Sequence, residues 1–377
     1  MNKSFMDMIY ETECRFKKYI MNYHDQPLIV LGGGVGAKSI VQYLKKSNIK
    51  KFHVCVDKEY WQCNKYTEGY PIENIEKVLT DNPDKQFDII VAFYVSHKTT
   101  MDFYKSKYGK SIANVIYEDI IPHFWMEPQI FTIDRSFYES HNEELTNLYN
   151  VLADDHSRKV LRSFIEQRIS GNFMYSEGLL SQEENEYFEP EIFNFQSDIT
   201  LIDCGAYDGE DTKRFFKIVS NNNCFSYIIE PDQNNLELIR KNLQDNSDCF
   251  IIINKAIWDS ETELTFQEGG GEGSGINDNG NNTISTISVD KLYDSDSERF
   301  SNTHTLIKMD IEGAELKAIQ GAERFISEQH PFLAICVYHK PEDIFEIAKK
   351  ILDINKEYKL YLRRYCCGFR DTVLYAM

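Results

Sequence analysis

Short apolar runs alternate with segments of helical periodicity in the first part of the chain. The runs cover Pro27–Leu31, Lys51–Val56, Phe87–Ala92 and Ala113–Tyr117. Apolar runs of this length, bounded by turn residues, are typical of buried strands, whereas Ser39–Leu44 has the spacing of a helix. Strands that alternate with helices predict a small parallel sheet, and we assign residues 1–124 to a Rossmann-like domain.

The same alternation returns near Thr200 and continues to the C-terminus. We predict strands near residues 200–204, 226–230, 250–254, 305–309 and 332–338, and a closing hairpin at 359–363 and 372–376. Tyr149–Asp155 and Arg158–Arg168 instead place apolar residues at helical spacing. The pattern therefore predicts a helical connector at residues 125–197, between two doubly wound α/β domains, the second at 198–377.

One segment, at residues 268–282, is rich in glycine and asparagine. Such a composition cannot bury apolar area, so we expect a mobile loop. It is either a tolerated insertion or a substrate lid.

The bulk composition narrows the class of protein. A chain of 377 residues favours two domains, and its net charge of −19 argues against nucleic acid as a partner. The N-terminus lacks a signal-peptide layout, and no apolar run approaches the roughly 20 residues of a membrane span. Nine scattered cysteines without a C-x-x-C pair indicate neither a zinc site nor a disulfide framework, which fits the cytoplasm.

The segment Leu201–Gly209 predicts a strand, a glycine turn and the start of a helix. Backbone N–H groups at such a helix start can bind a nucleoside cofactor, and an acid ending the next strand can accept hydrogen bonds from ribose. Lys255 and Ala256, after a third strand, can line an adenine pocket. The predicted cofactor residues are Asp203, Gly205, Ala206, Tyr207, Asp208, Gly209, Glu230, Pro231, Asp232, Lys255 and Ala256.

A second group of ionisable residues follows the later strands. Lys308, Asp310 and Glu312 alternate, so an extended backbone would point all three side chains to one side. His339 ends the strand at 332–338 and would lie on the same sheet edge. Its ordinary pKa suits proton transfer near neutrality. The alternative interpretation is a surface ion-pair set.

With Asp203-x-Gly-Ala, Glu230-Pro, Val289-Asp290 and Lys308-x-Asp-x-Glu-Gly-Ala-Glu315 in order, the chain resembles the FkbM family of S-adenosylmethionine-dependent methyltransferases over about residues 198–377. The resemblance implies a seven-stranded class I methyltransferase fold and O-methylation, often of sugars. Tyr207 stands where many methyltransferases outside this family have a third glycine, and the glycine-rich loop is longer than expected.

Methyl transfer to a hydroxyl needs an aligned nucleophile and a base. We assign His339 as the base, with Glu312 or Asp310 orienting it. Mg²⁺ on the carboxylates is the less favoured alternative, since the acids are few and close in sequence. Arg363, Arg364 and Lys340 form a candidate clamp for the phosphates of a nucleotide-sugar, or else pair with surface acids.

The N-terminal domain carries a competing signal. Gly32-x-Gly-x-x-Ala37, with Asp57 after the following strand, matches a dinucleotide fingerprint and alone suggests an NAD(P)-dependent oxidoreductase or epimerase. No Tyr-x-x-x-Lys pair follows, so we expect a vestigial, nucleotide-binding or homo-oligomerising domain. A third reading is a non-catalytic cofactor-binding scaffold, against which the intact Lys308–Glu315 block argues.

Overall fold

The computed structural model describes residues 4–93, 97–116, 133–195, 198–219, 223–267, 275–276, 282–368 and 370–377. The chain divides into two compact units. The first comprises Met1–Asn142, Leu161–Leu179 and Cys367–Phe369, and the second Glu143–Val160, Leu180–Cys366 and Arg370–Met377. Residues 125–197, which the sequence assigns to a separate connector, are thus shared between the units.

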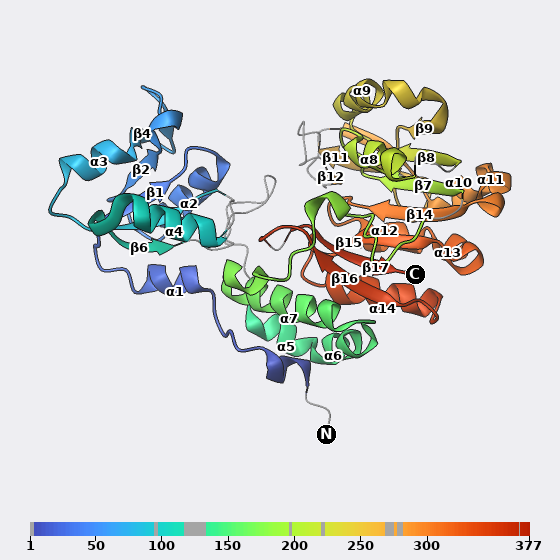
Figure 1. Ribbon diagram of the computed structural model, residues 1–377, viewed down its shortest axis with the longest axis horizontal. Helices are drawn as coiled ribbons and strands as arrows, with labels where there is room; N and C mark the ends of the chain where they lie inside the picture. Colours follow the sequence, from blue (N-terminus) through green and yellow to red (C-terminus); the bar gives the residue numbers. More distant parts are fainter. Residues whose placement is uncertain are drawn as a thin grey trace. The chain divides into compact units, whose positions relative to one another are not determined.

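The first unit is built on a parallel sheet with the strand order β4-β2-β1-β5-β6 (Figure 1). A short strand, β3, pairs antiparallel with β4 at the edge. The strands are β1 (Leu28–Leu31), β2 (His53–Val56), β3 (Tyr66–Thr67), β4 (Tyr70–Asn74), β5 (Phe87–Val91) and β6 (Ile112–Ile116). Four of them lie where the sequence predicts strands. Tyr117 lies outside the described residues.

Helices cover both faces of this sheet because successive strand residues point to opposite sides. Val30 and Ile90 pack in a core with residues of α1 (Arg15–Met21) and α2 (Val35–Lys46). Ile29 and Ile89 pack in a second core with residues of α3 (Ile75–Asp81) and α4 (His97–Tyr108). The first unit is therefore doubly wound, as predicted.

The second unit contains a sheet of seven strands among the described residues, in the order β16-β17-β15-β14-β7-β8-β9. Neighbours from β9 to β15 are parallel, whereas β17 runs antiparallel to both β15 and β16. This confirms the predicted sheet and closing hairpin. The strands are β7 (Ile199–Cys204), β8 (Cys224–Ile229), β9 (Phe250–Ile253), β14 (His304–Met309), β15 (Phe332–Cys336), β16 (Leu360–Arg364) and β17 (Thr372–Ala376).

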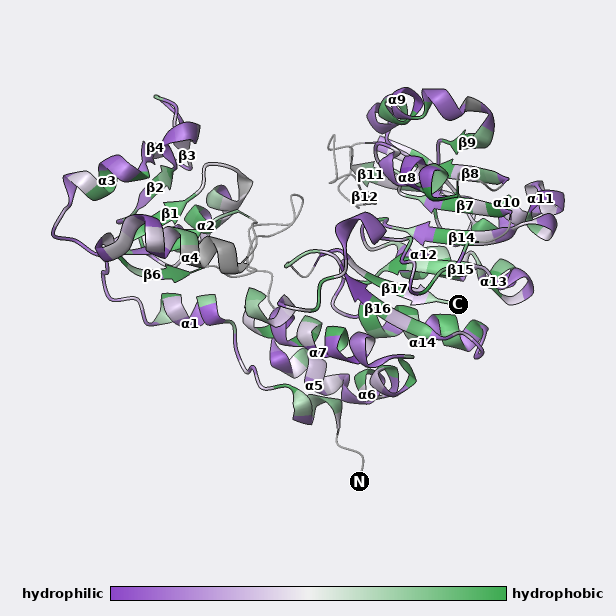
Figure 2. Cartoon of the chain, viewed as in Figure 1, coloured by the Kyte–Doolittle hydropathy of each residue, from purple (hydrophilic) through white to green (hydrophobic). Residues whose placement is uncertain are grey.

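Helices flank this sheet, and its central strands form the hydrophobic interior (Figure 2). The helices are α8 (Glu210–Ile218), α9 (Gln233–Asn242), α10 (Val289–Ser295), α11 (Ser297–Asn302), α12 (Glu315–Gln320), α13 (Glu323–Gln329) and α14 (Asp343–Ile354). A smaller sheet contains β10 (Ala256–Ile257), β11 (Glu263–Gln267), β12 (Gly275–Ile276) and β13 (Asn282–Ile287). Apart from β12 and Asn282, the glycine- and asparagine-rich segment lies outside the described residues.

The remaining helices lie between the two sheets in sequence. They are α5 (Arg135–Ser140), α6 (Asn142–Val151) and α7 (Asp155–Ser170), and one of the boundaries between the units falls within α7, between Val160 and Leu161. Short 3-10 helices cover Phe5–Met8, Lys58–Tyr60, Gly109–Ser111, Phe173–Ser176, Glu183–Asn185 and Gln244–Cys249. Within the described ranges, no helix combines the length and the apolar character needed to cross a membrane.

Candidate active site

The turn between β7 and α8 forms one side of the candidate site. Gly205, Tyr207 and Gly209 all have left-handed backbone, with φ of +78°, +50° and +81°. A Cβ atom at position 205 would lie 2.0 Å from the carbonyl oxygen of Asp310, so only glycine fits there. The turn therefore lies directly against the residue that follows β14.

The rest of this turn prepares the start of α8. Gly209 is the N-cap of α8, and a Cβ atom there would meet Ile239 and Leu243 only at 3.4 Å, which is ordinary contact. Its left-handed φ, more than close packing, therefore explains the glycine. Asp208 Oδ1 accepts a hydrogen bond from Glu210 N at 3.1 Å, and Ala206 is buried.

Glu230, directly after β8, is hydrogen-bonded to the turn. Its Oε2 accepts from Tyr207 N at 3.0 Å, and its Oε1 accepts from Asp232 N at 2.9 Å and Asn235 Nδ2 at 3.2 Å. Burial raises the pKa of Glu230 above its usual value, although these hydrogen bonds act against the rise. A carboxylate offers about four acceptor positions, so Glu230 can take a further donor such as a ribose hydroxyl.

The other predicted cofactor residues around Glu230 have structural partners. Asp232 caps α9 by accepting from Asn234 N at 2.8 Å. The Asn254 amide donates to the carbonyl oxygens of Glu230 and Pro231, both at 3.0 Å. Lys255 pairs with Glu261 at 3.6 Å, and Ala256 is buried in β10. Pro231 and Asp232 are thus parts of the scaffold around Glu230, whereas the contacts of Lys255 and Ala256 are with other groups.

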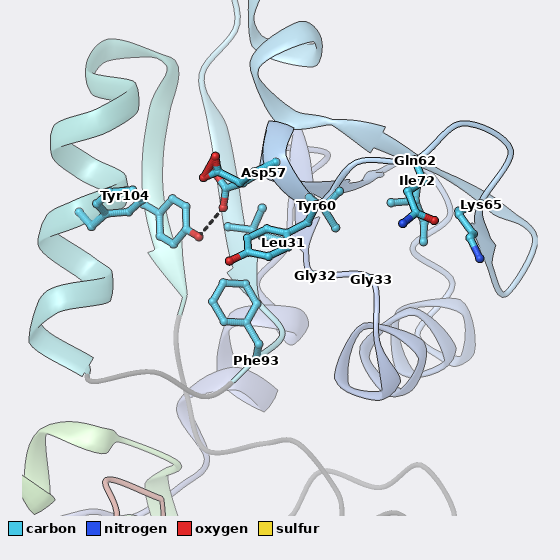
Figure 3. Close-up of a pocket in the computed structure, with 13 residues that line it drawn as sticks. Leu31, Gly32, Gly33, Asp57, Tyr60, Gln62, Lys65, Ile72, Phe93 and Tyr104 are labelled. Atoms are coloured by element: carbon cyan, nitrogen blue, oxygen red, sulfur yellow. Dashed lines mark hydrogen bonds between the residues drawn. The ribbon is translucent and has the colours of Figure 1, made fainter.

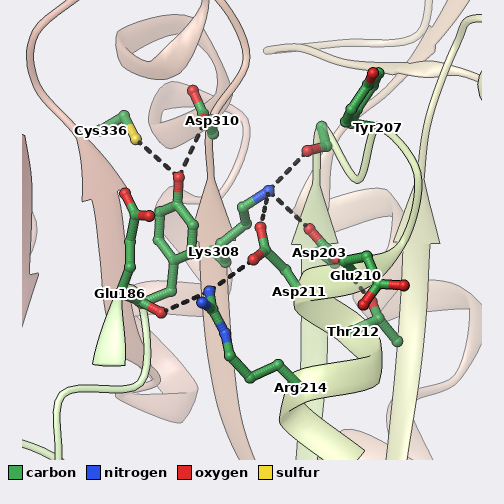
Figure 4. Close-up of polar contacts among 12 residues, drawn as sticks. Glu186, Asp203, Tyr207, Glu210, Asp211, Thr212, Arg214, Lys308, Asp310 and Cys336 are labelled. Atoms are coloured by element: carbon green, nitrogen blue, oxygen red, sulfur yellow. Dashed lines mark hydrogen bonds and ion pairs between the residues drawn. The ribbon is translucent and has the colours of Figure 1, made fainter. Parts of the chain in front are cut away.

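Lys308 and Asp203 occupy paired register positions on β14 and β7. Lys308 Nζ lies 3.1 Å from Asp203 Oδ1 and 3.4 Å from Asp211 Oδ2, and it donates to the Gly205 carbonyl at 2.7 Å (Figure 4). Burial alone would lower the pKa of Lys308, but the neighbouring carboxylates raise it well above its usual value. Lys308 thus stays protonated and fixes the turn, and it is not a proton carrier.

His339 lies among three carboxylates at the ends of β14 and β15. Its Nε2 is 3.3 Å from Asp310 Oδ1 and 3.2 Å from Glu312 Oε2, and its Nδ1 is 2.9 Å from Glu315 Oε1. Because β14 ends at Met309 and Glu312 has a left-handed φ of +58°, the expected extended backbone through Glu312 is wrong. The tight turn nevertheless brings Asp310 and Glu312 to the same ring.

The carboxylates set the protonation states in this cluster. Burial alone would lower the pKa of His339, but Glu315, Asp310 and Glu312 raise it well above its usual value, so the ring is an imidazolium at neutral pH. Against the effect of burial, His339 and Lys308 hold the pKa of Asp310 below its usual range. Burial raises the pKa of Glu312 to about 7. Glu312 is therefore the member that changes charge near neutrality.

The ring of His339 and the carboxylates around it differ in their exposure to solvent. The His339 side chain is only 4% exposed, whereas Asp310 and Glu312 are 26% and 19% exposed. The carboxylates are thus accessible and the ring lies behind them. A buried, protonated ring cannot take a proton from a substrate, which argues against the expected role of His339 as the base.

The segment before β7 supplies two groups that the sequence analysis missed. Tyr187 donates to Asp310 Oδ2 at 2.9 Å, and its ring centroid lies 5.1 Å from Lys308 Nζ. Burial and the charges of Asp371, Asp211 and Asp310 raise the pKa of Glu186 to about 9. No local sequence pattern marks these contacts, because Tyr187 and Asp310 are 123 positions apart.

Among the described residues, Asp310, Glu312 and His339 also have the spacing of a metal site. One ligand atom from each lies within 4.8 Å of the other two. Carboxylate and imidazole ligands together suit several divalent cations. The same three groups therefore support two chemistries, proton transfer and metal binding.

The predicted phosphate clamp is not assembled. Arg363 is buried, with its guanidinium 2.8 Å from Asp154 Oδ2 and 3.0 Å from Ser157 Oγ. Against the effect of burial, Arg363 lowers the pKa of Asp154 to about 2. Arg364 is fully buried. Only Lys340 is exposed, and its ammonium donates to the Gly313 carbonyl. A buried, paired guanidinium is not available to a phosphate, so the clamp expectation for Arg363 fails.

Comparison with known proteins agrees with this architecture. Residues 203–365 match the family model of the methyltransferase FkbM domain. No curated protein sequence is similar enough to count as a relative. A solved structure, methyltransferase FkbM from Methylobacillus flagellatus KT, is 21% identical and has a TM-score of 0.72, covering 98% of this chain and 95% of its own. This likeness confirms the fold.

Two further solved structures align with about half of the chain. One is precorrin-6y C5,15-methyltransferase from Geobacter metallireducens GS-15, with 12% identity and a TM-score of 0.30, covering 48% of this chain and 80% of its own. The other is Aeropyrum pernix fibrillarin with bound S-adenosyl-L-methionine, with 10% identity and a TM-score of 0.30, covering 48% of this chain and 66% of its own. At these scores neither supports an argument about this chain.

Proposed function

We propose that the second unit is an S-adenosylmethionine-dependent O-methyltransferase, because residues 203–365 match the family model of the methyltransferase FkbM domain. The acceptor we propose is a sugar hydroxyl, in a nucleotide-activated sugar or a polysaccharide precursor. The acceptor class rests on the family resemblance. The cofactor and the proton acceptor rest on the geometry of the site.

One observation carries the proposal: the backbone at Gly205 touches the backbone at Asp310. This contact joins the turn that would hold the methyl donor to the acids that would receive the acceptor's proton. Both lie at the carboxyl ends of adjacent parallel strands, the edge at which α/β sheets bind ligands. Donor and acceptor therefore have one place at which to meet.

The charges around the turn fit S-adenosylmethionine. When bound, it supplies a methyl group on a positively charged sulfonium. Glu230 and the turn from Gly205 to Gly209 would hold it. The acids nearby exceed the local cations: the buried Oε1 of Glu186 has no hydrogen-bond partner among the described residues, and burial raises the pKa of Asp211. A cationic ligand would relieve this excess, whereas the phosphates of NAD would add to it.

Glu312 is the proton acceptor in this proposal. Its carboxylate is partly exposed, and its pKa of about 7, raised by burial, leaves it ionised in a good part of the molecules at neutral pH. The His339 imidazolium lies behind it and orients the carboxylate, and Glu315 holds the other ring nitrogen. The residue that would receive the hydroxyl proton of the acceptor is thus Glu312, at Oε1 or Oε2.

The test is transfer of labelled methyl from S-adenosylmethionine to a panel of free sugars and nucleotide-sugars by the full chain. Radiolabel in one acceptor, with loss of that signal in E312Q but not in E346Q on α14, supports the proposal. NAD-dependent oxidation of the same panel would instead favour the oxidoreductase hypothesis. Cofactor binding without transfer to any acceptor would favour the scaffold hypothesis.

The metal alternative predicts a different response. If a divalent cation at Asp310, Glu312 and His339 activated the hydroxyl, chelation would abolish transfer and added Mg²⁺ or Mn²⁺ would restore it. Activity that persists after exhaustive chelation supports Glu312 as the proton acceptor.

A further inference from the structure

The first unit contains a cavity of about 770 Å³ at the carboxyl ends of its parallel strands (Figure 3). This volume lies within the roughly 300–1,000 Å³ range of small-molecule sites. Its walls combine backbone, aromatic rings and a few charged groups: Leu31, Gly32, Gly33, Val56, Asp57, Glu59, Tyr60, Gln62, Lys65, Ile72, Phe93, Phe103 and Tyr104.

The cavity lies where the topology of the sheet predicts a ligand. From β1 the chain builds outward through β2 to β4, and it then crosses back to β5 on the other side of β1. Ligands of open α/β sheets bind at this reversal, beyond the carboxyl ends of the strands. Leu31 at the end of β1, Asp57 after β2 and Phe93 after β5 all line the cavity.

One end of the cavity suits a phosphate. Gly33 lines it, and Gly34 is the N-cap of α2, which is 12 residues long. A Cβ atom added at Gly34 would meet nothing within 4 Å, so the space in front of the helix is open. Amide groups at a helix start favour anions, and the exposed Lys65 adds a positive charge to the cavity wall.

The other part of the cavity suits a planar ring. Tyr60 is 75% exposed and Phe103 is 49% exposed, which is unusual for large aromatic side chains. Figure 3 shows the ring of Tyr60 beside Phe93 and Leu31, close to Gly32. Exposed rings that line a cavity offer stacking surfaces for a nucleobase.

Asp57 is less available to a ribose than the acid of the dinucleotide fingerprint. The dinucleotide fingerprint uses this acid to hold the ribose hydroxyls. Here Asp57 already accepts hydrogen bonds from Tyr104 at 2.9 Å and from Lys107 and Tyr108 at 2.8 Å each. With about four acceptor positions on a carboxylate, it cannot receive both hydroxyls of a ribose diol without losing one of these partners.

We propose that this cavity is a second ligand site, which binds a nucleoside mono- or diphosphate with its phosphate at Gly33–Gly34 and its base against Tyr60, Phe93 and Phe103. The site belongs to the first unit and uses none of the residues of the methyl-transfer proposal. It therefore stands or fails independently of that proposal.

Calorimetric titration of the full chain with UDP, GDP, ADP and NAD⁺ tests the site, with two pairs of variants. In G34D a carboxylate caps α2 and occupies the phosphate position, so we expect nucleotide binding to be lost without a fall in melting temperature, whereas G34A should still bind. Y60A should weaken binding about tenfold through lost stacking. Y66A, at a tyrosine that is 65% exposed and lies outside the cavity lining, should not.

Binding of at least one nucleoside diphosphate, abolished in G34D and kept in G34A, supports the site. No binding of any probe by the wild-type chain overturns it and leaves oligomerisation as the surviving role for the first unit. NAD⁺ binding that is tighter than binding of every nucleoside diphosphate overturns the mononucleotide assignment. S-adenosylmethionine affinity, measured in the same variants, should be unchanged.

Discussion

Lys308 and Asp203 form an ion pair inside the second sheet, with Lys308 Nζ 3.1 Å from Asp203 Oδ1 across paired positions of β14 and β7. Thr212 donates to the second oxygen of Asp203 at 2.7 Å, and Lys308 also holds the Gly205 carbonyl. The pair thus ties the cofactor turn to the strand that leads into the acid cluster. The geometry of the acid cluster therefore depends on that of the cofactor turn.

A double-mutant cycle on this pair tests that coupling. K308M should lower the free energy of unfolding by about 3–5 kcal/mol, because it leaves the buried Asp203 carboxylate without its cation. The D203N/K308M double variant should lose less than the sum of the two single variants. Urea unfolding measures all four proteins. Losses that simply add would show that the two side chains are not coupled.

Two glycines of the cofactor turn should respond differently to alanine. In G209A the alanine must adopt a left-handed φ, which lowers the free energy of unfolding by about 1–2 kcal/mol. G205A requires the same φ and also places a methyl group 2.0 Å from the Asp310 carbonyl, so backbone must move. We expect a clearly larger drop in melting temperature in G205A than in G209A. We also expect G205A to lose S-adenosylmethionine binding. Equal drops would contradict the close approach to Asp310.

The strand pattern in the sequence predicts most of the sheet in each unit. Buried strands such as Leu28–Leu31 and Phe332–Cys336 are continuous apolar runs, and such runs need only local information. The edge strands β3 and β4 escape prediction, because Tyr70–Asn74 contains a proline and is only partly buried.

The candidate site is predictable only where its residues follow strands. Asp203 lies near the end of β7, and Glu230, Asp310 and His339 come after β8, β14 and β15, so sheet topology brings all four to one edge. Tyr187 and Glu186 reach that edge from a distant segment without regular secondary structure, so no periodicity reveals them. The protonation of His339 and the burial of Arg363 also depend on neighbours that are not adjacent in sequence.

The acid excess near the turn predicts a pH-dependent preference for the charged cofactor. Glu186 has a pKa raised by burial to about 9, so it is mostly protonated at neutral pH. A nearby sulfonium favours its ionised form, so affinity for S-adenosylmethionine should rise with pH toward that value, by at most about tenfold per pH unit. S-adenosylhomocysteine, which lacks the sulfonium charge, should show a weaker rise.

The E186Q variant should remove this difference between the two ligands, and E184Q, an exposed neighbour, should keep it. Calorimetric titrations across the pH range provide the affinities. A parallel pH dependence of both ligands in the wild-type chain would refute a role for the Glu186 charge.

The pH profile of methyl transfer separates the roles of Glu312 and His339. The rate should rise with pH through about 7, because the Glu312 carboxylate must be ionised to accept a proton. In H339Q, Glu312 loses the charge that lowers its pKa, so the rise should shift to higher pH and activity should recover there. An H339Q variant that is inactive at every pH, while still binding the cofactor, would restore His339 as the base.

Calorimetric titration of the full chain with S-adenosylmethionine tests whether the turn after β7 and Glu230 bind this cofactor. We predict one bound cofactor per chain and an affinity roughly tenfold to a hundredfold lower in E230Q, through loss of charged hydrogen bonds. E237Q, an exposed acid on α9, should bind like the wild type. An absence of binding by the wild-type chain, or equal affinity in a folded E230Q, would contradict the claim.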